Sequence, residues 1–303
     1  MAVKTVQAVV NGQTYTLTLN SSTGKYEATI TAPSKSSYNL TGHYYPVTVK
    51  AEDEAGNSET VTTSDTTLGS SLQLKVKEKV APIITITSPT AGAYITSNKP
   101  VIKWKVTDED SGVNTATIGI TIDSGSKITG DSIIKTAVTG GYECAYTPGT
   151  ALSDGSHTIK IDASDNDGNA ATQKSVTFKI DTVPPTLSVT APVNGLVTNN
   201  AAVTVKGTTN DATSSPVTVT VKLNSGTAES VAVGPDGSFS KALTLVSGSN
   251  TITVVAKDSA GKTTTVTRTV TLDTVAPVIK SVTLTPNPVD AGSTFIIAVE
   301  VTD

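Results

Sequence analysis

Three similar segments recur along this chain: VTVKAEDEAGN (residues 47–57), IKIDASDNDGN (159–169) and ITVVAKDSAGK (252–262). Each begins with alternating apolar and polar residues, which is the period of a β-strand with one buried face. Each then continues into the common pattern A-x-D-x-x-G. An aspartate there can bond the backbone of its own turn, and a glycine can take the positive φ that a tight turn needs. The repeat therefore predicts one β-hairpin in each of three units.

Proline-containing boundaries recur as well, at KVAPIIT (79–85), TVPPTLS (182–188) and TVAPVIK (274–280). Proline cannot donate to a sheet ladder, so it suits a linker or the first residue of an edge strand. The predicted units, in chain order, are 1–79, 80–181, 182–274 and a partial, two-strand segment at 275–303.

Short alternating strands are separated by turn signals about every 8–12 residues, and no stretch has a helical period. This is typical of an antiparallel β-sandwich. The predicted fold class is all-β, with tandem immunoglobulin-like sandwiches. Trp104 is the only tryptophan and lies inside the strand-like VIKWKV (101–106), so we expect it at the centre of the middle core.

The proline linker, the hairpin LSDGSHTIKIDASDNDGN (152–169) and the strand after it resemble bacterial immunoglobulin-like repeats. Such repeats occur in surface adhesins and in phage tail proteins. The arrangement of three units also resembles small proteins encoded among prophage tail genes. The resemblance implies the fold and leaves the function open, because such modules serve as spacers, adhesins and fibre segments alike.

The charge and hydropathy pattern excludes several classes of partner. The net charge is −4 and Arg268 is the only arginine, which argues against nucleic acid and against a polybasic membrane surface. No apolar stretch approaches 18 residues, so no membrane span is expected. The first residues also lack the long apolar core of a secretory signal. We therefore expect a protein of the virion or the extracellular space.

The sequence offers no catalytic constellation. It has no G-x-S-x-G motif, and His43 and His157 both fall at repeated turns. Cys144 follows Tyr142 on an apolar strand, where a buried thiol is expected rather than a reactive one. The prediction is a non-enzyme without an organic cofactor.

Acidic residues gather at one end of the middle unit. The loop after its second strand and its last hairpin turn should lie at the same end of the sandwich. Asp108, Asp110, Asp165 and Asp167, with Glu109 beside them, would then form a calcium site. The alternative is a solvated acidic loop that Lys75, Lys77 and Lys79 partly neutralise. The third unit keeps only Asp211 and Asp258, so the site would not be general.

Tyrosines are concentrated in the first unit. The group without counterparts in the other units comprises Tyr38, His43, Tyr44 and Tyr45. Tyrosine suits interfaces, so these residues could form a contact surface, for a host cell-surface glycan or for another subunit. Core packing is the other interpretation.

The first unit and the last segment look complementary. Aligned to the middle unit, KTVQAVVNGQTYTLTL (4–19) corresponds to the part after Asp110, and VEVTD (299–303) matches WKVTD (104–108). We expect head-to-tail association, in which the last segment completes the first unit of the next molecule. The strand residues predicted to do so are Phe295, Ile297, Val299 and Val301. The alternatives are that both ends are only boundaries of the sequence, or that another tail protein supplies the partner.

The sequence favours two functional classes. The first is a non-enzymatic structural or adhesive phage virion protein, a tail-associated rod or fibre. The alternative is a bacterial cell-surface adhesin or a subunit of a pilus-like filament. A spacer detached from a cell-wall enzyme is a third class, but it would need a catalytic domain that these residues do not provide.

Overall fold

The computed structural model describes residues 2–303, and the chain forms two compact units, Met1–Ile180 and Asp181–Asp303. Apart from three single-turn 3-10 helices, the regular structure of these residues is entirely β. The all-β prediction is confirmed. The fourfold division of the chain stays a prediction.

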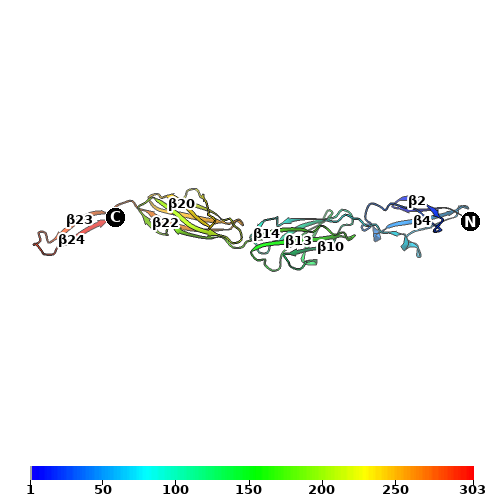
Figure 1. The fold of residues 1–303 in the computed structure, drawn as a ribbon, viewed down its shortest axis with the longest axis horizontal. Coiled ribbons are helices and arrows are strands. Elements are labelled where there is room, and N and C mark those ends of the chain that lie inside the picture. Colours follow the sequence, from blue (N-terminus) through cyan, green and yellow to red (C-terminus); the bar gives the residue numbers. More distant parts are fainter. Residues whose placement is uncertain (1) are drawn as a thin grey trace. The chain divides into compact units, whose positions relative to one another are not determined.

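The N-terminal part forms one sheet, here called the first sheet, in the order β3-β2-β1-β4-β5 with β6 paired to β4 (Figure 1). Its strands are β1 (Val3–Val10), β2 (Gln13–Asn20), β3 (Lys25–Glu27), β4 (Tyr45–Asp53), β5 (Ser58–Val61) and β6 (Gln73–Leu74). The 3-10 turns Thr41–His43 and Gly69–Leu72 connect them. Among residues 2–79, only Ala8, Val10 and Tyr45 are buried apolar side chains. No second sheet covers them within that segment.

The middle sandwich, β7 to β14, consists of two four-stranded sheets in the orders β10-β13-β14-β8 and β11-β12-β9-β7. Its strands are β7 (Ile83–Ser88), β8 (Tyr94–Ile95), β9 (Ile102–Thr107), β10 (Val113–Ile122), β11 (Ile134–Val138), β12 (Gly141–Tyr146), β13 (Gly155–Asp165) and β14 (Lys174–Ile180). A 3-10 turn, Gly130–Ser132, precedes β11. Trp104 is 1% exposed in the core between the sheets, as predicted.

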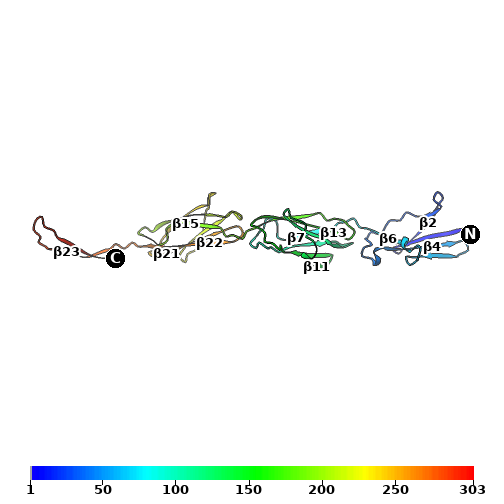
Figure 2. The ribbon, with the colours of Figure 1, turned by 90° about the horizontal axis from the view of Figure 1, so that it is seen from below.

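The third sandwich, β15 to β22, pairs a three-stranded sheet, β15-β17-β20, with a five-stranded sheet, β16-β22-β21-β18-β19 (Figure 2). Its strands are β15 (Thr186–Ala191), β16 (Leu196–Thr198), β17 (Ala202–Asn210), β18 (Thr218–Leu223), β19 (Glu229–Val231), β20 (Ser238–Thr244), β21 (Gly248–Lys257) and β22 (Thr263–Leu272). Alternate residues of β17, β18, β21 and β22 fill its core.

Strand pairing is antiparallel except at one place in each sandwich. The short strand β8 runs parallel to β14, and β16 runs parallel to β22. In each case a short early strand therefore lies beside the last strand of its own sandwich.

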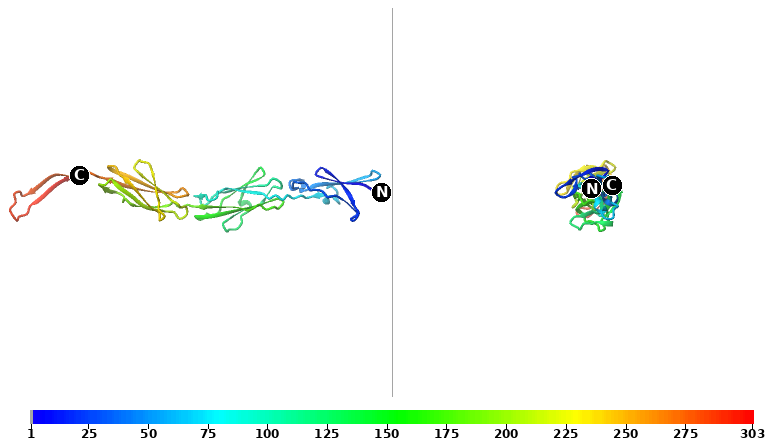
Figure 3. Two further views of the ribbon diagram at one scale, coloured as in Figure 1. Left: turned by 45° about the horizontal axis from the view of Figure 1, so that its top comes forward. Right: turned by 90° about the vertical axis from the view of Figure 1, so that its right-hand side faces the viewer.

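The last two strands, β23 (Val278–Thr285) and β24 (Ile296–Thr302), form a two-stranded antiparallel sheet, here called the tail hairpin (Figure 3). Every residue of both strands is exposed. The tail hairpin is therefore a pair of β-strands without a core of its own.

Candidate functional site

The repeated aspartate organises the end of each sheet at which the candidate site lies. The Oδ1 atoms of Asp53, Asp165 and Asp258 each accept the backbone N–H four residues further on, at 2.9, 2.7 and 2.8 Å respectively. The glycine of each turn has the expected positive φ, 86° at Gly56 and 96° at Gly168. The predicted turn chemistry is confirmed.

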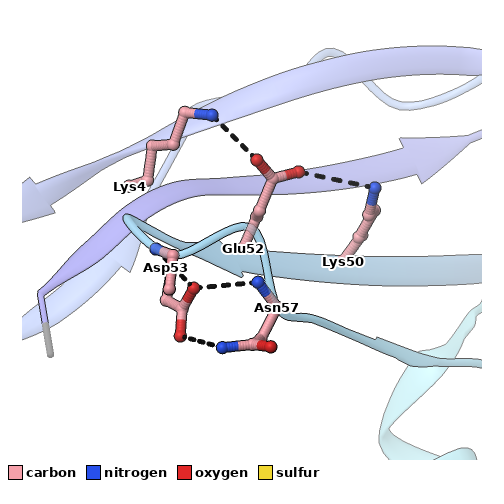
Figure 4. Close-up of polar contacts among 6 residues, drawn as sticks. Lys4, Lys50, Glu52, Asp53 and Asn57 are labelled. Carbon is pink, nitrogen blue, oxygen red and sulfur yellow. Dashed lines mark hydrogen bonds and ion pairs between the residues drawn. The ribbon is translucent and has the colours of Figure 1, made fainter.

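The second carboxylate oxygen of this aspartate has a partner in two of the three copies. Asn57 Nδ2 donates to Asp53 Oδ2 at 2.9 Å, which Figure 4 shows beside the Lys4–Glu52 ion pair. Asn169 Nδ2 donates to Asp165 Oδ2 at 2.7 Å. Lys262 stands at the corresponding place in the third copy, and Asp258 Oδ2 is buried there without a hydrogen-bond partner.

A group of three carboxylates, here called the middle cluster, lies at one end of the middle sandwich. It comprises Glu78, Asp108 and Asp165, which offer ligand atoms within 4.8 Å of one another. Backbone N–H groups hold all three, since Gly112 donates to Asp108 at 2.7 Å, Ser111 donates to Glu78 at 2.6 Å, and Asn169 donates to Asp165 at 2.7 Å. The structure thus brings together two of the four predicted ligands and adds a glutamate that the sequence reasoning missed.

The middle cluster is electrostatically crowded. Burial raises the pKa of the Glu78 carboxyl above its ordinary value, and the nearby negative charges of Asp108 and Asp110 add to the rise. The hydrogen bonds from Ser111 act in the opposite direction. A cation would relieve this repulsion.

The other two predicted ligands bond to backbone instead. Asp110 Oδ2 accepts Ser36 N–H at 3.0 Å, and Asp167 Oδ2 accepts Glu78 N–H at 2.9 Å. Lys77 Nζ donates to the carbonyl oxygen of Asp167 at 3.1 Å, rather than to a carboxylate. These contacts tie the first sheet and its linker to the middle sandwich, and calcium at the four predicted aspartates stays a prediction.

A second group, here called the third cluster, repeats the arrangement inside the second compact unit. Asp181, Asp211 and Asp258 offer ligand atoms within 4.8 Å of one another, and all three are buried. The sequence reasoning counted only Asp211 and Asp258 in this unit and missed Asp181. The missed signal is an acidic residue four positions before the boundary proline, which occurs as E-K-V-A-P at Glu78 and D-T-V-P-P at Asp181.

The tyrosine group divides between core and surface. Tyr45 is buried, and its hydroxyl donates to Lys35 O at 3.2 Å, so it is not part of an exposed contact surface. Tyr38 and His43 stack with ring centroids 4.6 Å apart, and Tyr44 is half-buried. A contact role for these three residues stays a prediction.

The predicted assembly residues lie on and beside the tail hairpin. Ile297, Val299 and Val301 belong to β24, and Phe295 directly precedes it. Their exposed fractions run from 47% for Phe295 to 59% for Ile297. They are free to contact another sheet.

The remaining titratable groups of interest have structural partners. His157 bonds Asp123 Oδ2 at 2.8 Å and Ser153 O at 2.7 Å. Burial acts to lower the pKa of His157, but the bonds to Ser153 and Asp123 outweigh it and leave this pKa raised. Burial raises the pKa of the Cys144 thiol to about 11, which keeps it protonated near neutral pH, as expected of a core cysteine.

Across residues 2–303, no helix has the length and apolar character needed to cross a bilayer.

Two family models match the chain. Residues 87–182 match a bacterial Ig-like domain, and residues 185–274 match domain B of glucodextranase. Bacillopeptidase F of Bacillus subtilis (strain 168) is 29% identical over 185 residues, which are 61% of this chain and 11% of that protein. The chain thus spans only a small part of this relative.

Several solved structures resemble the chain. The fibronectin(III)-like modules of Clostridium thermocellum CbhA are 19% identical with a TM-score of 0.37, over 63% of this chain and 94% of that one. A tetra-tandem repeat from the extending region of a large adhesion protein is 20% identical with a TM-score of 0.34, over 98% and 79%. Sidekick-1 immunoglobulin domains 1–4 are 12% identical with a TM-score of 0.39, over 89% and 68%.

Proposed function

Because residues 87–182 match a bacterial immunoglobulin-like domain and residues 186–272 form a second sandwich, we propose that this chain is a non-catalytic structural or adhesive protein. We further propose that its copies associate, with the tail hairpin of one completing the first sheet of another. The observation that supports this association is the exposed apolar face of the tail hairpin.

The tail hairpin has the same strand pairing as the first two long strands of each sandwich. Its register pairs Val278 with Thr302 and Thr285 with Ile296, and it contains one bulge. The pair β7–β9 has the same antiparallel arrangement with one bulge, and so has β15–β17. In the middle sandwich this pair forms the outer half of one sheet, with β12 paired to β9.

The side chains that such a pair normally buries are exposed in the tail hairpin. VEVTD aligns with WKVTD, which places Val299 at the position of Trp104 and Val301 at that of Val106. Trp104 and Val106 are 1% and 0% exposed, whereas Val299 and Val301 are 49% and 53% exposed. Burying an aliphatic side chain contributes roughly 1.5–3 kcal/mol. Covering this face would therefore be strongly favourable.

The first sheet has an edge strand, β3, to which the tail hairpin could pair. Its β3 pairs with β2 over only three residues, and residues 28–32 are in no strand. The equivalent β12 extends over six residues because β9 pairs with its other edge. In that arrangement Tyr142 faces Val106, so the proposed complex would place Tyr26 opposite Val301.

The association is tested on the full chain by sedimentation velocity and electron microscopy over a range of concentrations. We expect oligomers that grow with concentration, and monomers when residues 275–303 are deleted. Val299→Asp should weaken association at least about tenfold, because it places a charge in the proposed interface.

The matched control is Ile296→Asp, which changes the opposite face of the same strand. It should leave association nearly unchanged. Monomers of the intact chain at every concentration, or equal loss of association in both variants, would refute the proposed contact while leaving the structural role intact.

A second candidate rests on the match to Bacillopeptidase F. The chain would then be an accessory Ig-like region of a larger enzyme, in which the catalytic part lies elsewhere. An antibody against the third sandwich distinguishes the two on immunoblots of the producing cells, where a much larger band favours the accessory region. The phage-tail and surface-adhesin roles stay predictions, to be tested by looking for the protein in purified virions and in cell-wall extracts.

A further inference from the structure

We propose that the third cluster, Asp181, Asp211 and Asp258, is a calcium-binding site within the second compact unit. It joins the segment that leads into β15, where Asp181 lies, to the loop after β17 and to the turn after β21.

The three carboxylates are concentrated in a buried place. Their residues are 0%, 8% and 5% exposed, and one oxygen from each lies within 4.8 Å of the others. Among the described residues, no lysine or arginine forms an ion pair with any of them. Like charges this close and this shielded from water repel one another unless a cation lies between them.

One oxygen of each carboxylate is already fixed by backbone donors. Val183 N–H donates to Asp181 Oδ1 at 3.1 Å, Ser214 N–H to Asp211 Oδ1 at 2.6 Å, and Lys262 N–H to Asp258 Oδ1 at 2.8 Å. The Ser214 hydroxyl also donates to Asp181 Oδ2. The carboxylates are thus positioned before any ion arrives.

Asp258 Oδ2 is the atom that points to a ligand. This oxygen is buried and has no hydrogen-bond partner, and the residue as a whole is only 5% exposed. Nearly all buried polar atoms in proteins are paired, so an orphan carboxylate oxygen needs a partner such as an ion. In the middle cluster, Asn169 Nδ2 supplies that partner to the equivalent Asp165 Oδ2. The third cluster lacks this amide.

The donors at the site select the class of ion. Carboxylate and hydroxyl oxygens, with no nitrogen or sulfur donor among them, suit a hard cation. Calcium accepts six to eight oxygens in flexible geometry, whereas magnesium requires a near-octahedral set. Three carboxylates held by three separate segments favour the more tolerant ion, and its two charges would neutralise most of theirs.

The test uses the full chain after chelator treatment, with calcium chloride as the probe, by titration calorimetry and scanning calorimetry. We expect calcium binding and a rise in the melting temperature of the third sandwich, by about 5 °C or more when calcium far exceeds its dissociation constant. Asp258→Asn should bind one ion fewer per chain and lose the rise. Without calcium it should melt at or above the wild-type temperature, because one buried charge is gone.

The matched control is Asp236→Asn in an exposed turn of the same sandwich, which should keep the full calcium response. Asp211→Asn serves as a second site variant if circular dichroism shows that Asp258→Asn is misfolded. A wild-type chain without a calcium response, a response that Asp258→Asn retains, or an equal response to magnesium would overturn the proposal.

Discussion

His157 and Asp123 occupy in the middle sandwich the places that Asn250 and Asn224 occupy in the third. His157 Nδ1 bonds Asp123 Oδ2 at 2.8 Å, and Asn224 Nδ2 donates to Asn250 Oδ1 at 3.1 Å. Asp123 and Asn224 each also accept a backbone N–H from the strand, at Thr158 and Thr251. The same hydrogen-bonding arrangement is therefore formed by titratable groups in the middle sandwich and by neutral amides in the third.

This difference predicts that the pair adds a pH dependence near neutral pH to the middle sandwich, and that its amide counterpart adds none to the third. The folded-state pKa of His157 is raised, so its contribution to the free energy of unfolding is complete below the ordinary histidine pKa of about 6.5. The contribution is lost as the pH rises through the folded-state value. Urea unfolding followed by Trp104 fluorescence should therefore give lower stability at pH 8.5 than at pH 6.

The double variant His157→Asn with Asp123→Asn copies the amide pair of the third sandwich. It should remove most of this slope between pH 6 and pH 8.5. A slope that survives in the double variant would assign the pH dependence to other groups.

The residues of the repeated turn could be predicted from the sequence, but the full carboxylate clusters could not. The roles of Asp165 and Gly168 depend only on contacts within a turn of about four residues. Glu78 and Asp181 reach their clusters through the path of the linker, which alternation and turn signals do not specify. Whether Tyr45 belongs to the core or to a contact surface could not be decided for the same reason, because its burial depends on the packing around β4.

At the level of strands, Gly207 of β17 allows a close contact with Phe239 of β20. A Cβ atom on Gly207 would lie 2.2 Å from Ser188 O and 2.5 Å from Cζ of Phe239. Gly207 faces Phe239 across the β17–β20 pair. The ring of Phe239 therefore lies where a larger residue at position 207 would place its side chain.

Gly207→Ala should destabilise the third sandwich by about 1–3 kcal/mol, because a methyl group there overpacks the contact. Chemical unfolding followed by circular dichroism measures the change. Gly149→Ala is the control, since its Cβ would meet no atom within 4 Å. If the two variants lose equal stability, the close approach of Ser188 O and Phe239 is not the cause.

The strand predictions follow the same division between local and distant information. Alternation identified long strands such as β9 and β13, in which buried residues alternate with half-buried or exposed ones over most of their length. The two-residue β8 and the three-residue β16 were not predicted. A strand this short has no readable period, and its existence depends on the partner strand that binds it.

At the scale of the whole chain, two separate apolar cores lie in two compact units. Ile159 and Ile252 are equivalent residues of the repeated segment, and both are fully buried. Ile252→Ala should cost the third sandwich about 2–5 kcal/mol and leave the Trp104 fluorescence transition unchanged. Ile159→Ala should shift that transition by a similar amount. A fluorescence shift in Ile252→Ala would mean that the two cores unfold together.

The parallel pairs β8–β14 and β16–β22 determine how each sandwich would carry tension. A pull that acts on β16 from its N-terminal side and on β22 from its C-terminal side slides the two strands along each other. Their slanted, evenly spaced hydrogen bonds then share the load and must break together, instead of opening one after another as in a peeled hairpin. A sandwich loaded in this way would resist stretching in shear at these few residues.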